Sequence, residues 1–143
     1  MDKLFTYTDG GSRGNPGHSA ISILITKGTN EDDEKGRIIF QHGEYIGIGT
    51  NNQAEYKALI KALQESQKLS RGDILCTLDS ELVVRQLIGE YKVKSSDLKP
   101  LYEEVKLLEK SFKSVSYRHV RRENPFIQKA DSMVNNVLDE NGY

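Results

Sequence analysis

Apolar residues in the first third of the chain recur in short runs or at every second position, as they do in β-strands. Residues 4–8 are apolar and aromatic and stop at Asp9-Gly10-Gly11, which predicts a strand that ends in a glycine-rich turn. Ile21, Ile23 and Ile25 predict a second strand, and residues 37–48 predict a third. The polar, acidic residues 30–36 predict a solvated loop between them. Together these features indicate an antiparallel meander.

The hydrophobic period then changes to that of a helix. Ala54, Ala58, Leu59, Ala62 and Leu63 predict a helix from Asn52 to about Gln67. Asn52 and Glu55, three residues apart, match a capping box at the start of this helix.

Shorter elements complete the pattern. Residues 74–78 predict a buried strand, and Ser80 opens a short helix that Gly89 closes. Pro100 begins a third helix, residues 115–120 predict a fifth strand, and residues 127–138 predict the last helix.

The predicted order is therefore β-β-β-α-β-α-α-β-α. A strand–helix–strand unit favours parallel pairing with a right-handed crossover. We expect an α/β fold in which helices flank both faces of a mixed five-stranded sheet. A chain of 143 residues is long enough to bury a core, and residues 1–143 are expected to form a single domain.

Charge and cysteine content narrow the possibilities further. The 20 basic and 21 acidic residues give a net charge of -1, so any nucleic-acid contact must come from a local patch. Cys76 is the single cysteine, which excludes an internal disulfide, and its apolar surroundings indicate a buried thiol. No apolar run reaches membrane-spanning length and no signal peptide is evident, so we expect a cytoplasmic protein without membrane contact.

Four acidic residues follow predicted strands or lie near the start of predicted helices: Asp9, Glu55, Asp79 and Asp131. Each one alone has an ordinary explanation as a turn, cap or surface residue. In open α/β sheets, however, ligands gather outside the carboxyl ends of the strands, where these residues would converge. Clustered carboxylates repel one another unless cations neutralise them. An all-oxygen ligand set indicates Mg²⁺ or Mn²⁺.

The segments that contain these residues share a family resemblance. Residues 7–17 read YTDGGSRGNPG, residues 50–55 read TNNQAE, and residues 78–80 and 130–131 read LDS and AD. In this order and on these elements, they resemble type 1 ribonuclease H across nearly the whole chain.

The resemblance implies a ribonuclease H-like sheet of order 3-2-1-4-5 with strand 2 antiparallel to the rest. It also implies endonucleolytic hydrolysis of the RNA strand of RNA–DNA hybrids, leaving 3′-hydroxyl and 5′-phosphate ends. By the same resemblance, two Mg²⁺ ions about 4 Å apart are held by the four acidic residues, and Mn²⁺ is a substitute. Asp9 is expected to bridge both ions.

Recognition of the hybrid requires polar groups that reach the 2′-hydroxyls of RNA. The candidates are Gly10, Gly11, Ser12, Asn15, Asn51 and Asn52, although residues 15–17 are equally explained as a turn. Thr50 matches the family position that helps to hold a DNA phosphate. Lys92 and Lys94 are candidate phosphate contacts, with a solvated surface as the alternative.

The chain departs from many relatives at two places. It is too short near Lys92 to form the longer basic insertion that grips substrate, and residues 121–128 lack the loop histidine. Either Glu123 serves near the metals, or Arg121 and Arg122 contact phosphate. His119 lies in a predicted strand, where a structural role is expected.

Several other functions are compatible with parts of this pattern. Cleavage of other RNA-containing duplexes, including double-stranded RNA, is the nearest alternative. Integrases, resolvases and exonucleases share the fold. A hybrid-binding module without cleavage and a structural protein are the non-enzymatic alternatives, and the four filled acidic positions argue against the first. We expect a monomeric hybrid-specific ribonuclease.

Overall fold

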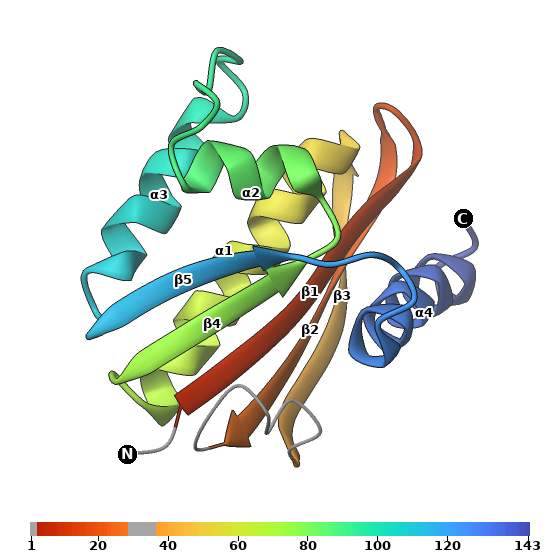
Figure 1. The fold of residues 1–143 in the computed structure, drawn as a ribbon. Coiled ribbons are helices and arrows are strands. Elements are labelled where there is room, and N and C mark those ends of the chain that lie inside the picture. Colours follow the sequence, from red (N-terminus) through yellow and green to blue (C-terminus); the bar gives the residue numbers. More distant parts are fainter. Residues whose placement is uncertain (1–2, 29–36) are drawn as a thin grey trace.

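The computed structural model describes residues 3–28 and 37–143, so the predicted acidic loop at residues 30–36 lies outside the described residues. The elements follow the predicted order (Figure 1). They are β1 (Lys3–Gly14), β2 (Gly17–Gly28), β3 (Ile38–Gly49), α1 (Asn51–Leu69), β4 (Asp73–Leu78), α2 (Glu81–Leu87), α3 (Lys99–Glu109), β5 (Ser114–His119) and α4 (Pro125–Glu140). In this part of the chain, no helix is both long and apolar enough to cross a membrane.

The five strands form one sheet in the order β3-β2-β1-β4-β5, as expected. β2 runs antiparallel to β1 and β3, whereas β1, β4 and β5 are parallel to one another. Helix α1 packs on one face of the sheet with α2 and α3, and α4 covers the other face (Figure 1).

The alternation along the strands explains this layering. Ile21, Ile23 and Ile25 of β2 are buried in the cluster that contains α1, whereas Leu24 is buried in the cluster that contains α4 residues. Successive side chains of a strand point to opposite faces, so both faces of the central strands are buried. Cys76 of β4 is buried as predicted, and burial raises the pKa of its thiol to about 12.

The predicted end of the first strand at Asp9 is wrong. β1 continues through the glycines to Gly14 and pairs with β2 along its whole length, so Asp9 lies opposite Ser22. The turn follows at a cis Asn15–Pro16 bond. Pairing with β4, however, stops at Tyr7 and Thr77. Asp9 therefore lies where the parallel part of the sheet ends, although not where its own strand ends.

The predicted capping box of α1 is also wrong. The N-cap is Thr50, whose hydroxyl accepts from the backbone N–H of Gln53 at 3.1 Å, and Gln53 Oε1 accepts from the Thr50 N–H at 2.9 Å. This pair satisfies the free backbone donors at the helix start. Glu55 therefore has no capping role and is available for the site where the pairing of β1 with β4 ends.

Candidate active site

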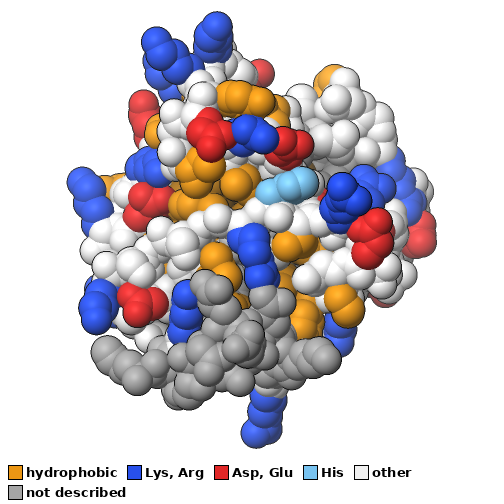
Figure 2. Space-filling model, viewed as in Figure 1, with side chains coloured by type: hydrophobic (Ala, Val, Ile, Leu, Met, Phe, Trp, Pro, Cys, Tyr) orange, Lys and Arg blue, Asp and Glu red, His pale blue; other side chains and the backbone are white. Residues whose placement is uncertain are grey.

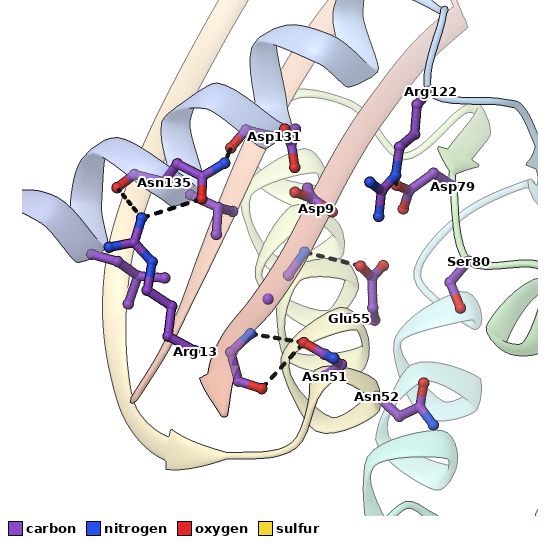
Figure 3. Close-up of a pocket in the computed structure, with 15 residues that line it drawn as sticks. Asp9, Arg13, Asn51, Asn52, Glu55, Asp79, Ser80, Arg122, Asp131 and Asn135 are labelled. Carbon is purple, nitrogen blue, oxygen red and sulfur yellow. Dashed lines mark hydrogen bonds and ion pairs between the residues drawn. The ribbon is translucent and has the colours of Figure 1, made fainter. Parts of the chain in front are cut away.

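Three of the predicted carboxylates converge in the structure. Asp9 lies on β1, Asp79 directly follows β4, and Glu55 lies in the first turns of α1. Each offers a carboxylate oxygen, and these oxygens lie within 4.8 Å of one another. We call these residues the acidic triad. Because β1 and β4 are parallel neighbours, Asp9 and Asp79 meet at one edge, and α1 brings Glu55 against them (Figure 3).

Asp131 of α4 completes the predicted set at a greater distance. It lines the same cavity as the triad, with a volume of about 320 Å³, but lies outside the 4.8 Å group. Figure 3 shows it beside Asp9, on the side away from Asp79. Its negative charge contributes to the raised pKa of Asp9. The fourth carboxylate thus borders the same cavity as the triad without belonging to its closest group.

Two of the three carboxyl groups of the triad are buried. Asp9 is 5% exposed and Glu55 6% exposed. Burial, followed by the charge of Asp79, raises the pKa of Asp9 to about 7, and burial together with the charge of Asp9 raises the pKa of Glu55 well above its usual range. Ionising both carboxyls without a counter-charge is therefore costly.

The oxygen atoms of the triad fit a hard divalent cation. Glu55 Oε1 accepts from the Gly10 N–H at 3.2 Å, whereas Oε2 is buried and has no hydrogen-bond partner among the described residues. An orphaned buried carboxylate oxygen beside two further carboxylates is the donor chemistry that Mg²⁺ or Mn²⁺ uses. The triad, with Asp131 beside it, is thus suited to hold such ions.

The raised pKa values predict an unusual pH dependence of stability without metal. The folded protein keeps protons on Asp9 up to about pH 7, whereas the unfolded chain releases them near the ordinary value of 3.8. Because the folded state binds more protons between these values, the free energy of unfolding decreases as pH rises through this window. The same reasoning applies to Glu55.

Urea unfolding in a chelator at pH 5 and pH 8 tests this expectation, with Asp9→Asn as the matched variant. The stability of the parent relative to the variant should fall by a few kcal/mol between the two pH values. Mg²⁺ at pH 8 should restore it, because the ion favours the ionised carboxylates. A parent that gains stability over the variant as pH rises would contradict this account.

One side of the cavity is lined by neutral polar groups from two segments. The Ser12 N–H and hydroxyl donate to Asn51 Oδ1 at 2.8 and 3.1 Å, and Asn15 Oδ1 accepts from the Asn51 N–H at 3.1 Å. Gly10, Gly11 and Asn52 line the cavity next to them. The structure therefore brings the predicted 2′-hydroxyl contacts together beside the triad.

The remaining predicted contacts, Thr50, Lys92 and Lys94, do not line this cavity. Thr50 and Asn15 line a smaller neighbouring cavity that shares Asn52 with the first. Lys92 lines a separate cavity between α2 and α3, and Lys94 is exposed in the same connection. Figure 2 shows basic side chains projecting over this connection. Neither lysine reaches the carboxylates, so each can contribute only to an extended substrate surface.

The cavity is also lined by residues whose role the sequence leaves open or does not indicate. Of the loop alternatives, Arg122 and not Glu123 lines the cavity, with Nε 3.7 Å from Asp79 Oδ2. Burial raises the pKa of Asp79, and the Arg122 charge opposes that rise. Arg13 and Asn135 also line the cavity, and no sequence signal identified them, because they meet only through the packing of α4 on the sheet.

The chain is similar to several known proteins over most of its length. A family model described as reverse transcriptase-like matches residues 7–137. The bifunctional protein Rv2228c of Mycobacterium tuberculosis is 34% identical over 138 residues, which make up 96% of this chain and 36% of that protein. Ribonuclease HI of Halobacterium salinarum is 36% identical over 138 residues, which make up 96% of this chain and 65% of that protein. The chain thus spans between about a third and two thirds of these curated relatives' length.

A solved structure is similar to the chain in both sequence and fold. LC11-RNase H1 in complex with an RNA/DNA hybrid has a TM-score of 0.87 and 36% sequence identity, covering 98% of this chain and 99% of that chain.

Proposed function

The chain belongs to the type 1 ribonuclease H family, and from this premise we propose that it hydrolyses the RNA strand of RNA–DNA hybrids with two divalent metal ions. One observation carries the proposal. Asp9, Glu55 and Asp79 converge beside polar residues of β1 and α1 that include Ser12 and Asn51. The similarity to LC11-RNase H1, whose structure contains a hybrid, supports the substrate class.

The acidic residues supply the ligands in this proposal. Asp9, which interacts with the carboxylates of Glu55, Asp79 and Asp131, would be shared between the two ions in this proposal. Two bound ions would supply an activated water molecule and would stabilise the leaving oxygen of a phosphodiester. The expected products carry 3′-hydroxyl and 5′-phosphate ends. Mg²⁺ is the proposed ion, with Mn²⁺ as a substitute.

The protein itself provides orientation and selectivity. In the described part of the chain, Asn15 and Asn51 use their side-chain carbonyls within the protein, which leaves their amide NH₂ groups for substrate. Such donors suit the 2′-hydroxyls that distinguish RNA from DNA. Arg122 lies beside Asp79 with 85% of its side chain exposed, where its charge can meet a phosphate. We further propose that the protein acts as a monomer.

A panel of labelled duplexes tests the substrate assignment. RNA–DNA hybrid, double-stranded RNA and double-stranded DNA are incubated with Mg²⁺ or with a chelator, and each strand is followed on a denaturing gel. We expect Mg²⁺-dependent cleavage of the RNA strand of the hybrid alone. Additional cleavage of double-stranded RNA would identify the broader RNA-duplex activity instead. Cleavage of DNA, or none in any duplex, would exclude a ribonuclease H.

The chemistry of the product ends tests the metal-ion mechanism separately. Hydrolysis through metal-activated water leaves a 3′-hydroxyl, which a polymerase can extend. Attack by the neighbouring 2′-hydroxyl of the RNA would instead leave a 2′,3′-cyclic phosphate. Products that cannot be extended until the cyclic phosphate is removed would contradict the proposed mechanism.

Lys92 and Lys94 should make sequence-independent phosphate contacts. Replacing both by Ala is expected to weaken hybrid binding and to lower the slope of log affinity against log salt by about one for each lysine removed. Lys110 and Lys113 lie at the opposite end of β5 from His119, so their double replacement is the control. Fluorescence anisotropy over a range of salt measures both. If the two double variants had equal slopes of log affinity against log salt, Lys92 and Lys94 would not be substrate contacts.

A further inference from the structure

Arg13, near the end of β1, connects this strand to the last helix, α4. Its guanidinium donates to Asp139 Oδ1 at 2.7 Å through one nitrogen, and to the backbone oxygen and Oδ1 of Asn135 at 3.4 and 3.3 Å through the other. Figure 3 shows Arg13 reaching toward Asn135 along the wall of the cavity. A planar guanidinium suits several directed contacts of this kind, which an ammonium group cannot make together.

The same contacts lead to the backbone of Asp131, the residue that carries the fourth carboxylate. Asn135 Nδ2 donates to the backbone oxygen of Asp131 at 3.2 Å, one helical turn earlier. The buried residues Ala130, Val134 and Leu138 hold the apolar face of α4 on the sheet, and Ser22 Oγ donates to the Ala130 oxygen at 2.6 Å. Arg13 instead fastens the face of α4 that borders the cavity.

A second contact strengthens the same junction. The ring of Tyr143, which follows α4, stacks on His18 with 3.5 Å between centroids and 9° between planes. The Nδ1 atom of His18 is in turn 2.8 Å from the Tyr45 hydroxyl. Two independent contacts therefore hold the end of α4 against the segment around the β1–β2 turn.

This turn also contacts the start of α1. Ser12 and Asn15 hydrogen-bond to Asn51 at the beginning of that helix, which carries Glu55. Residues 12–15 thus connect the two helices that bring acidic side chains to the cavity. Asp131 needs such a connection, because like charges in the triad repel it and it lies outside the 4.8 Å group.

We propose that Arg13 is a positioning residue that holds Asp131 where it can share a metal ion with the triad. The inference rests on the proposed function and deepens it, because it assigns a residue outside the four carboxylates to assembly of the metal site. Residues that orient metal ligands commonly change metal affinity by about 10-fold or more when they are replaced.

Mn²⁺ binding without substrate, measured by electron paramagnetic resonance, is the primary test. Arg13→Ala should weaken Mn²⁺ affinity about tenfold, and Asn135→Ala should do the same. Arg13→Lys should recover only part of the loss, because the ammonium cannot reproduce the branched contacts. Arg71→Ala is the control, since Arg71 is exposed and lies at the opposite end of β4 from Asp79.

Kinetics and stability separate positioning from other roles. In Arg13→Ala, kcat should be lower at limiting Mg²⁺ and should return to the parental value at high Mg²⁺. KM for the hybrid should be unchanged. The urea midpoint should hardly change, since an exposed ion pair adds little to stability. In an Asp131→Asn background, Arg13→Ala should have no further effect on Mn²⁺ affinity, because its action passes through Asp131.

The outcomes distinguish the inference from the proposed function. Unchanged Mn²⁺ affinity in Arg13→Ala, beside a parent that binds the ion, would overturn the inference and leave the ribonuclease assignment intact. A rise in KM alone, or an effect that persists in the Asp131→Asn background, would also overturn it. A parent that binds no Mn²⁺ would overturn the metal site and the role of Arg13 together.

Discussion

Replacing Asp9 by Asn is expected to reduce cleavage of the RNA strand by about a thousandfold or more while hybrid binding persists. Asp9 interacts with each of the other three carboxylates and is buried at the centre of the group. Asn has nearly the same shape but no charge, so the change removes the proposed anionic metal ligand without leaving a void. Single-turnover cleavage and anisotropy with the same labelled hybrid measure the two quantities separately.

The matched control is Glu104→Gln, which removes an exposed carboxylate from α3. It should cleave at the parental rate. Without metal at pH 8, Asp9→Asn should also be more stable than the parent, because burying one fewer charge relieves repulsion within the triad. An Asp9→Asn variant that cleaves as fast as the parent would show that the metal site has been assigned wrongly.

The second large effect is expected from Gly10→Ala. A Cβ atom at Gly10 would lie 2.3 Å from the backbone carbon of Ala54, 2.4 Å from its oxygen and 2.5 Å from the nitrogen of Glu55. These are backbone atoms of α1, so no side-chain rotation relieves the clash. We expect the free energy of unfolding to fall by about 3 kcal/mol or more, as β1 and α1 are forced apart.

Gly11→Ala provides the control on the adjacent residue. Its Cβ would lie 3.5 Å from Cγ1 of Val134, an ordinary van der Waals contact. Urea unfolding should therefore separate the two variants clearly, with Gly11→Ala close to the parent. Any folded fraction of Gly10→Ala should also lose activity, since separation of the elements moves Glu55 from Asp9. Equal stability of the two variants would refute the proposed close approach of β1 and α1.

This close approach of β1 and α1 explains why the sequence predicts too early an end for the first strand. Asp9-Gly10 is a common turn signal, and glycines carry no side chain to reveal an alternating pattern. The segment is in fact a strand, because β2 pairs with it to Gly14, and Gly10 is required by the backbone of α1. In β2, by contrast, the large side chains of Ile21, Ile23 and Ile25 recur at every second position, and the sequence predicts this strand.

Only the part of the candidate site that lies in local sequence motifs could be predicted. Asp9, Glu55 and Asp79 lie in recognisable segments, and the structure brings their oxygens together. Arg13 and Asn135 are separated by 122 residues, and their contact depends on how α4 crosses the sheet. The sequence predicts Asn52 as the cap of α1, whereas the cap in the structure is Thr50. All three residues at positions 50–52 are favourable helix caps, so the sequence alone does not decide among them.

These acidic residues are proposed to hold a pair of metal ions against an RNA strand. Crystals grown with an RNA–DNA hybrid in a chelator, then transferred briefly to Mn²⁺, test this proposal by anomalous diffraction. The account predicts two Mn²⁺ peaks about 4 Å apart, both in contact with Asp9, next to a broken RNA linkage. Mn²⁺ bound away from Asp9, with the RNA strand intact, would contradict it.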